Sequence, residues 1–143
     1  MPGTRDRAAA EPVRTRLAAA GAAAITVGLG LGLRAWSTGT VAKYGGDALY
    51  TVLLLTLVVF AAPRVTPLRA AGSALAVSCL VEFVQLSPLP AELSRHSTVA
   101  RLLLGSTFNP PDLFWYSAGA AFGWLVHTSV LNRRPAPPPR TPG

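Results

Sequence analysis

The sequence has few of the residues that build disulfides, metal sites or hydrolytic centres. Its one cysteine, Cys79, lies within an apolar run, where a single thiol can neither form an internal disulfide nor supply a metal-site spacing. We interpret it as a small core-filling hydrophobe. The two histidines, His96 and His127, are isolated, and neither a Gly-x-Ser-x-Gly motif nor a phosphate-binding loop occurs. The sequence therefore predicts no metal and no cofactor.

Charged residues are also scarce. They make up 13% of the 143 residues, whereas about 25% is usual for a soluble domain. The net charge of +7 does not indicate nucleic-acid binding, because the cations flank apolar runs and form no basic stripe interleaved with aromatic residues. Half of the chain is hydrophobic. The partner that this composition predicts is a lipid bilayer.

Four apolar runs have nearly the length of membrane spans, at residues 17–33, 47–62, 70–86 and 109–131. They predict an all-α fold, a four-helix transmembrane bundle over residues 17–131. The first run also resembles a signal peptide, but no convincing cleavage site follows it, and we interpret it as an uncleaved anchor. Residues 1–16 and the proline-rich residues 132–143 are predicted to be disordered cytoplasmic tails.

The connections between the runs are predicted to differ in character. Residues 35–46 should form a polar, glycine-containing loop. Residues 91–104 are too short and too charged to span a membrane, and they predict a short interfacial helix between the third and fourth spans. Ser97 is a candidate N-cap of that helix, and Gly105 a candidate terminator.

Cation placement predicts the orientation. With four spans, nine of the 13 cations lie on the side of the termini, and the other four are Arg34, Lys43, Arg95 and Arg101. Because cytoplasmic loops carry the excess of Lys and Arg, both termini should be cytoplasmic.

Glu82 is the most informative polar residue, because an ionised carboxylate inside a membrane is costly unless it is paired or lies in a wet cavity. Gln85 follows at the spacing that places both on one helix face. We predict that Glu82 faces the bundle interior and pairs with Arg101, near Asp47 and Asp112, in an outward-facing cluster of acids, arginines and Gln85 at the membrane surface. For Asp47, a helix-capping role and a site role remain equally open.

Two Gly-x-x-x-Gly motifs, Gly28/Gly32 and Gly119/Gly123, allow helices to approach closely. They predict contact between the first and fourth spans. Dimerisation through the same motifs, and hence a homo-oligomer, remains open. For Gly28 and Gly32, a chain that is simply rich in glycine and alanine is the alternative.

The polar residues carry a resemblance to a known family. The chain resembles the domain-of-unknown-function 2809 family in 46–50 (GDALY), 101–108 (RLLLGSTF), Glu82, Gln85, Asp112, Tyr116, Gly119 and Gly123. The resemblance covers about residues 17–131 and implies a small, multi-pass protein of the bacterial plasma membrane with no established activity. The order of the polar residues also resembles, more distantly, the VanZ-like family associated with glycopeptide-antibiotic resistance. The VanZ-like family usually has an asparagine after its last aspartate, and in this chain that asparagine is replaced around Tyr116.

Three functions remain open for these residues. In the first, an accessory protein binds an anionic envelope lipid or its headgroup through Arg34 and Arg101. In the second, a membrane enzyme uses Glu82 and Asp112 as catalytic groups. In the third, the residues only hold the helices together. The candidate binding residues are Arg34, Asp47, Glu82, Gln85, Arg101, Ser106, Asp112 and Tyr116.

Overall fold

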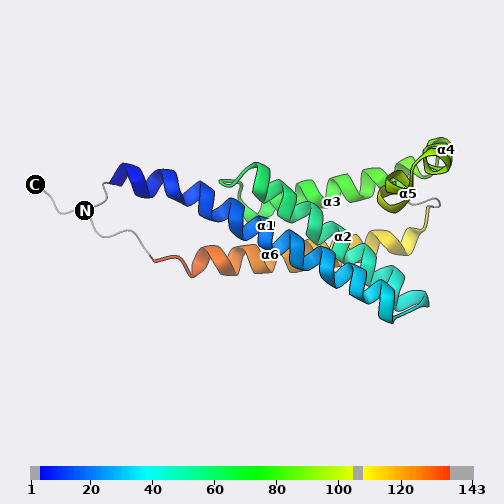
Figure 1. Ribbon diagram of the computed structural model, residues 1–143, viewed down its shortest axis with the longest axis horizontal. Coiled ribbons are helices and arrows are strands. Elements are labelled where there is room, and N and C mark those ends of the chain that lie inside the picture. Colours follow the sequence, from blue (N-terminus) through cyan, green and yellow to red (C-terminus); the bar gives the residue numbers. More distant parts are fainter. Residues whose placement is uncertain (1–3, 105–107, 136–143) are drawn as a thin grey trace, which may run out of the picture.

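The computed structural model describes residues 4–104 and 108–135. Six α-helices make up this part of the chain, and no strand occurs in it, which confirms the all-α prediction. Figure 1 shows their order along the chain. The helices are α1 Thr4–Trp36, α2 Gly39–Ala61, α3 Pro67–Val84, α4 Leu89–His96, α5 Thr98–Leu104 and α6 Pro110–Asn132.

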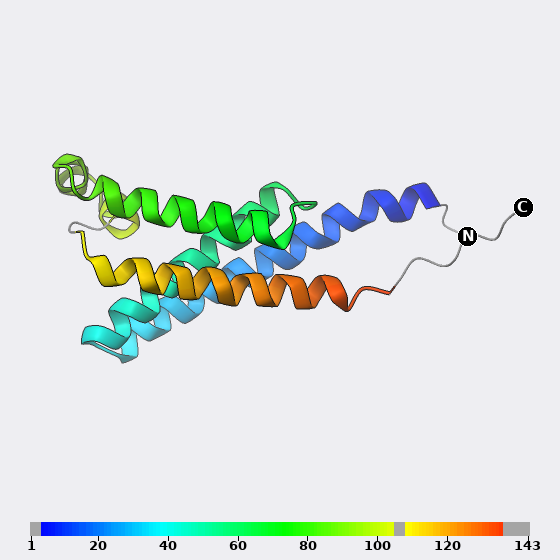
Figure 2. The ribbon, with the colours of Figure 1, turned by 180° about the vertical axis from the view of Figure 1, so that it is seen from behind.

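The four long helices lie side by side, with α2 at the centre (Figures 1 and 2). α2 packs against α1, α3 and α6, and α3 also packs against α6. The start of α1, the turn between α2 and α3 and the end of α6 lie at one end, which we call the α2–α3 end. The α1–α2 turn, the short pair α4 and α5 and the start of α6 lie at the other, the α1–α2 end.

Three of the helices are long and apolar enough to cross a membrane: residues 10–36 of α1, α2 and α3. Large side chains on their surfaces, among them Leu17, Leu57 and Leu80, are exposed rather than packed within the chain. Such apolar surfaces indicate a membrane protein. α6, the fourth predicted span, has 23 residues, but its tryptophan, histidine, serine and glycine residues make it less apolar.

Two helices, α1 and α2, begin many residues before their predicted starts. α1 begins at Thr4 rather than at residue 17, so residues 4–16 are helical and not a disordered tail. This stretch is rich in alanine, the strongest helix former, and Arg16 Nε donates a 3.1 Å hydrogen bond to the carbonyl of Phe60 on α2. α2 begins at Gly39, so most of the predicted loop 35–46 is helical and only residues 37–38 connect α1 to α2.

Residues 89–104 form two short helices, and the second of them, α5, is the helix predicted between Ser97 and Gly105, while α4 precedes it. The Oγ atom of Ser97 accepts a hydrogen bond of 3.2 Å from the backbone N–H of Ala100, which confirms Ser97 as the cap of the second helix. Gly105, its predicted terminator, lies outside the described residues.

Small side chains occupy most of the buried face of α3. On α3 four of the five buried residues recur every fourth position, as Ala70, Ala74, Ser78 and Glu82, and the fifth is Ala71. Small residues at such positions let helix backbones approach closely in lipid. The face that α3 buries therefore ends in a carboxylate at the α1–α2 end.

The Gly-x-x-x-Gly motif of α6 contacts α2 and not α1. A Cβ atom on Gly119 would collide with the backbone carbonyl of Ala48, and one on Gly123 would press against the side chain of Leu55. A Cβ on Gly28 or Gly32 would meet nothing within 4 Å. The prediction that these glycines bring the first and fourth spans together is therefore wrong, since α6 uses its glycines to approach the central helix.

Candidate functional site

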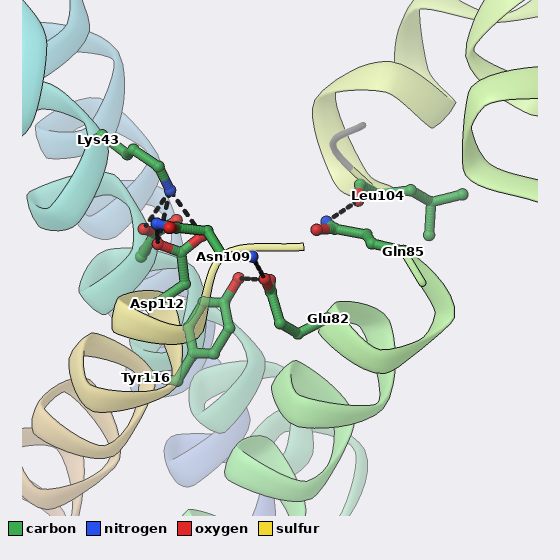
Figure 3. A network of polar contacts seen from close by, with 8 residues as sticks. Lys43, Glu82, Gln85, Leu104, Asn109, Asp112 and Tyr116 are labelled. Carbon is green, nitrogen blue, oxygen red and sulfur yellow. Dashed lines mark hydrogen bonds and ion pairs between the residues drawn. The ribbon is translucent and has the colours of Figure 1, made fainter. Parts of the chain in front are cut away.

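Glu82 lies in the last turn of α3, and none of its surface is exposed. Its Oε2 atom accepts a 3.1 Å hydrogen bond from the hydroxyl of Tyr116 on α6. Its Oε1 atom accepts a hydrogen bond of 2.5 Å from the backbone N–H of Asn109, just before α6 (Figure 3). A buried carboxylate requires such donors, because burial without them is costly. Glu82 therefore faces the bundle interior and joins α3 to the start of α6.

The predicted ion pair between Glu82 and Arg101 does not form. Arg101 lies exposed on α5, and within the described part of the chain it makes no ion pair. Tyr116 and the Asn109 amide already use both oxygens of Glu82. A neutral hydroxyl and a backbone amide are cheaper to bury than a guanidinium, which remains hydrated at the surface.

Lys43 of α2 is the cation that enters the site. Its Nζ atom lies 2.6 Å from both carboxylate oxygens of Asp112 on α6, and 3.5 Å from Oδ2 of Asp47 one turn further along α2. The side chain of Asp112 is 6% exposed and that of Lys43 is 45% exposed. The ion pair is thus buried on its acidic side and open to solvent on its basic side. Asp112 also lies in the first turn of α6, where the helix dipole favours a negative charge.

Asn109 joins the two acidic positions. It precedes α6 at the N-cap position, but its side chain does not cap the helix. Instead, its side-chain amide donates a hydrogen bond of 2.5 Å to Oδ1 of Asp112, while its backbone N–H donates to Glu82. The residues so connected, which we call the polar cluster, are Lys43, Asp47, Glu82, Asn109, Asp112 and Tyr116.

Aromatic side chains border the polar cluster. The ring of Tyr44 stacks on that of Trp115 at 5.6 Å between centroids, and Lys43 Nζ lies 5.5 Å from the Tyr44 ring centroid. The rings of Tyr50 and Tyr116 lie 6.3 Å apart. These contacts add apolar packing between α2 and α6 around the charged groups.

Gln85 lies beside the polar cluster and faces α5. Its side-chain amide donates to the backbone carbonyl of Leu104, the last residue of α5 (Figure 3). Its Oε1 atom is buried and has no hydrogen-bond partner among the described residues. Gln85 therefore holds the end of α5 against the end of α3.

Of the predicted site residues, the structure brings together Asp47, Glu82, Asp112 and Tyr116, with Gln85 adjacent. Arg34 and Arg101 are exposed and do not take part in the polar cluster. Ser106 lies outside the described residues. Two members were missed, Lys43 and Asn109. The i, i+4 spacing of Lys43 and Asp47 would have indicated the first, had the helix been extended to residue 39.

The polar cluster contains three carboxylates and one ammonium group. Glu82 is satisfied by neutral donors, and the two aspartates share Lys43. Among the described residues, no group of three or more His, Cys, Asp or Glu side chains could hold a metal ion. The arrangement joins three helices through groups that the chain itself supplies.

The comparisons with known proteins agree with the resemblance in the sequence. The family model described as "Protein of unknown function (DUF2809)" matches residues 36–120, more than half of the chain. This range contains every member of the polar cluster. No curated protein and no solved structure matches the chain. The chain belongs to the DUF2809 family of proteins of unknown function.

Proposed function

We propose that the chain is a four-span protein of the bacterial plasma membrane with both termini in the cytoplasm. α6 would be the fourth span, because 23 helical residues extend about 34 Å and a bilayer core is about 30 Å thick. It packs along α2 and α3, two helices that are apolar enough to span. In this topology the arginine-rich α2–α3 end faces the cytoplasm and the polar cluster lies at the outer surface. α4 and α5 would then lie at the outer interface.

Within that topology, the role that the geometry supports best for the polar cluster is structural. The observation that carries this proposal is the 2.6 Å ion pair between Lys43 and Asp112, which joins α2 to α6 beside the bonds from α6 to Glu82. Each charged group of the cluster has a partner within the chain. The cluster would therefore fix the outer ends of α2, α3 and α6, as expected of a structural or accessory subunit.

A second candidate, binding of an envelope-lipid headgroup, is favoured by the charge balance of the cluster. Three carboxylates exceed one ammonium group, so the ligand would carry an amine rather than only an anionic phosphate. Arg34 and Arg101 are exposed outside the cluster and do not contribute cations to it. The catalytic alternative has less support, because both oxygens of Glu82 already accept hydrogen bonds. The distant VanZ-like relation rests on the order of the polar residues alone.

A double-mutant cycle tests the structural role. We expect Lys43→Met and Asp112→Asn each to destabilise the full-length protein, with a coupling of about 0.5–3 kcal/mol between them. The free energy of unfolding would be measured by titration with a denaturing detergent, once in lipid-free micelles and once in lipid nanodiscs. The matched control combines Arg101→Gln with Asp112→Asn, and the effects of these two substitutions on the free energy of unfolding should add.

If the coupling energy between Lys43→Met and Asp112→Asn is the same in micelles and in nanodiscs, the structural role is supported. Coupling that requires phosphatidylethanolamine, together with retention of that lipid on purification, would favour the headgroup-binding candidate instead. Additive effects of Lys43→Met and Asp112→Asn in both media would overturn the structural role.

A further inference from the structure

A cavity of about 270 Å³ lies at the α2–α3 end, opposite the polar cluster. It is open to solvent on one side and bordered by the start of α1, the turn between α2 and α3, and the end of α6, three segments that lie at this end in Figures 1 and 2. The lining residues that bear charge are Glu11, Arg64 and Arg134. The rest of the lining is made by Pro12, Thr15, Pro63, Val65, Thr66, Pro67 and Leu131.

The charges in this cavity do not balance. Arg134 Nη1 lies 2.7 Å from Oε1 of Glu11, and its Nη2 donates to the hydroxyl of Thr15 at 3.0 Å. Glu11 is therefore neutralised by Arg134. Arg64 makes no ion pair with any carboxylate in residues 10–102 and 108–135, where side chains are described. The described residues of the lining thus carry one guanidinium in excess.

The backbone adds to this positive potential. α3, a helix of 18 residues, begins at the cavity wall, where Thr66 is its N-cap and Pro67 its first residue. The N-terminus of a helix carries a partial positive charge. α6 ends nearby with the opposite polarity, but Arg134 follows that end and offsets it.

We propose that this cavity binds a phosphate group, from an anionic lipid headgroup or from a soluble phosphate compound. Arg64 would donate the two parallel hydrogen bonds of its guanidinium group to the phosphate. Arg134, which is held in place by Glu11 and Thr15, would border the phosphate on another side. The volume lies just below the range of about 300–1,000 Å³ that is usual for small-molecule sites, and so suits a headgroup rather than a whole lipid. Basic pockets between spans on the cytoplasmic side are suited to anionic headgroups.

The alternative to a defined phosphate site is weak, non-specific attraction of anions by this end of the protein. Arginines gather at this end for orientation alone, and a surface of that kind attracts any anion weakly and without a defined contact. Salt separates the two explanations, since the Debye length falls to roughly 4 Å in 0.5 M salt. A contact at hydrogen-bond distance persists under that condition.

The test is lipid binding by the full-length protein in neutral detergent at this salt concentration. Short-chain phosphatidylglycerol is the probe, phosphatidylethanolamine the reference lipid, and millimolar inorganic phosphate the competitor. We expect Arg64→Gln to weaken phosphatidylglycerol binding about tenfold, the loss of one charge-assisted hydrogen bond. The matched control is Arg69→Gln, an equal charge change on the first turns of α3 outside the cavity lining, which should change binding less than about twofold. Both side chains are exposed, and an unchanged unfolding midpoint verifies that the variants are folded.

Two outcomes support the site and identify its ligand. If phosphatidylglycerol binds and inorganic phosphate does not displace it, the source is a lipid. If inorganic phosphate binds through Arg64 with or without the lipid, the source is a soluble phosphate. The proposal is overturned if neither probe binds in high salt, or if Arg64→Gln and Arg69→Gln weaken binding equally. Neither result bears on the polar cluster, which lies at the other end.

Discussion

The hydroxyl of Tyr116 on α6 donates a hydrogen bond of 3.1 Å to Oε2 of Glu82, a carboxylate with none of its surface exposed on α3. A tyrosine thus partners an acid for which the sequence predicts an arginine. The tyrosine ring contributes apolar surface to the interface while its hydroxyl satisfies the acid, so no second buried charge is needed. The only other donor to Glu82 within the described residues is the backbone N–H of Asn109.

Tyr116→Phe should therefore destabilise the protein. The substitution keeps the ring but removes one of two donors to a buried carboxylate, and leaving such a group unsatisfied costs about 1–3 kcal/mol. The free energy of unfolding in detergent measures the loss. Tyr50→Phe is the matched control, because among the described residues no hydrogen bond to the Tyr50 hydroxyl occurs, and its effect should stay within about 0.5 kcal/mol. Equal effects of the two variants would show that the Tyr116 hydroxyl does not support Glu82.

Glu82 and Arg101 should show no energetic coupling. Glu82→Ala removes a fully buried, doubly hydrogen-bonded side chain and should be strongly destabilising, whereas Arg101→Leu changes an exposed residue. Because the two are not partners, their effects on the free energy of unfolding should add within about 0.5 kcal/mol. If Arg101→Leu restores stability to Glu82→Ala, the ion pair predicted from the sequence forms after all.

The sequence predicts the helices better than the contacts. Apolar runs are long-range signals, so all four long helices were expected, whereas helix ends depend on local packing. Residues 39–46 have the glycines of a loop, yet they are helical in the structure. An added Cβ on Gly45 would require the end of the Leu33 side chain on α1 to move, so this glycine lies at the contact between α1 and α2 and not in a loop. Extending α2 to Gly39 then places Lys43 one turn before Asp47.

The site was predicted where residue type decides the chemistry and missed where the backbone decides it. Glu82 and Asp112 are unusual in an apolar context, and both lie in the polar cluster. The contact of Asn109 with Glu82 is made by its backbone N–H, which every non-proline residue possesses, so no residue pattern identifies that contact. Charge alone predicts Arg34 and Arg101 as site residues, but both are exposed, and exposed cations keep their hydration at the ends of helices.

Gly119→Ala should be far more damaging than Gly28→Ala. The new methyl group at Gly119 would collide with the backbone carbonyl of Ala48, which cannot rotate away, and overpacking of this kind costs about 1–3 kcal/mol or more. At Gly28 a Cβ meets nothing within 4 Å, and alanine favours the helix over glycine by up to about 1 kcal/mol. Unfolding titrations of the two variants compare them directly. A large loss at Gly28 accompanied by dissociation of a dimer would show that α1 uses its glycines between copies of the chain.

The last prediction concerns α6, whose membrane crossing decides the topology. If α6 spans, the chain crosses four times and both ends lie in the cytoplasm; if it lies on the surface, the three more apolar helices place the two ends on opposite sides. We expect a reporter fused after Gly143 to be active in the cytoplasm. In a Cys79→Ala background, a membrane-impermeant thiol reagent applied to whole cells should label Ser37→Cys in the α1–α2 turn and spare Arg64→Cys in the α2–α3 turn. A reporter active only outside the cell, with the same labelling of the two cysteines, would mean that α6 does not cross. It would also separate the middle of α6 from α2 and α3, which is incompatible with the close approach of Gly119 to the backbone of Ala48.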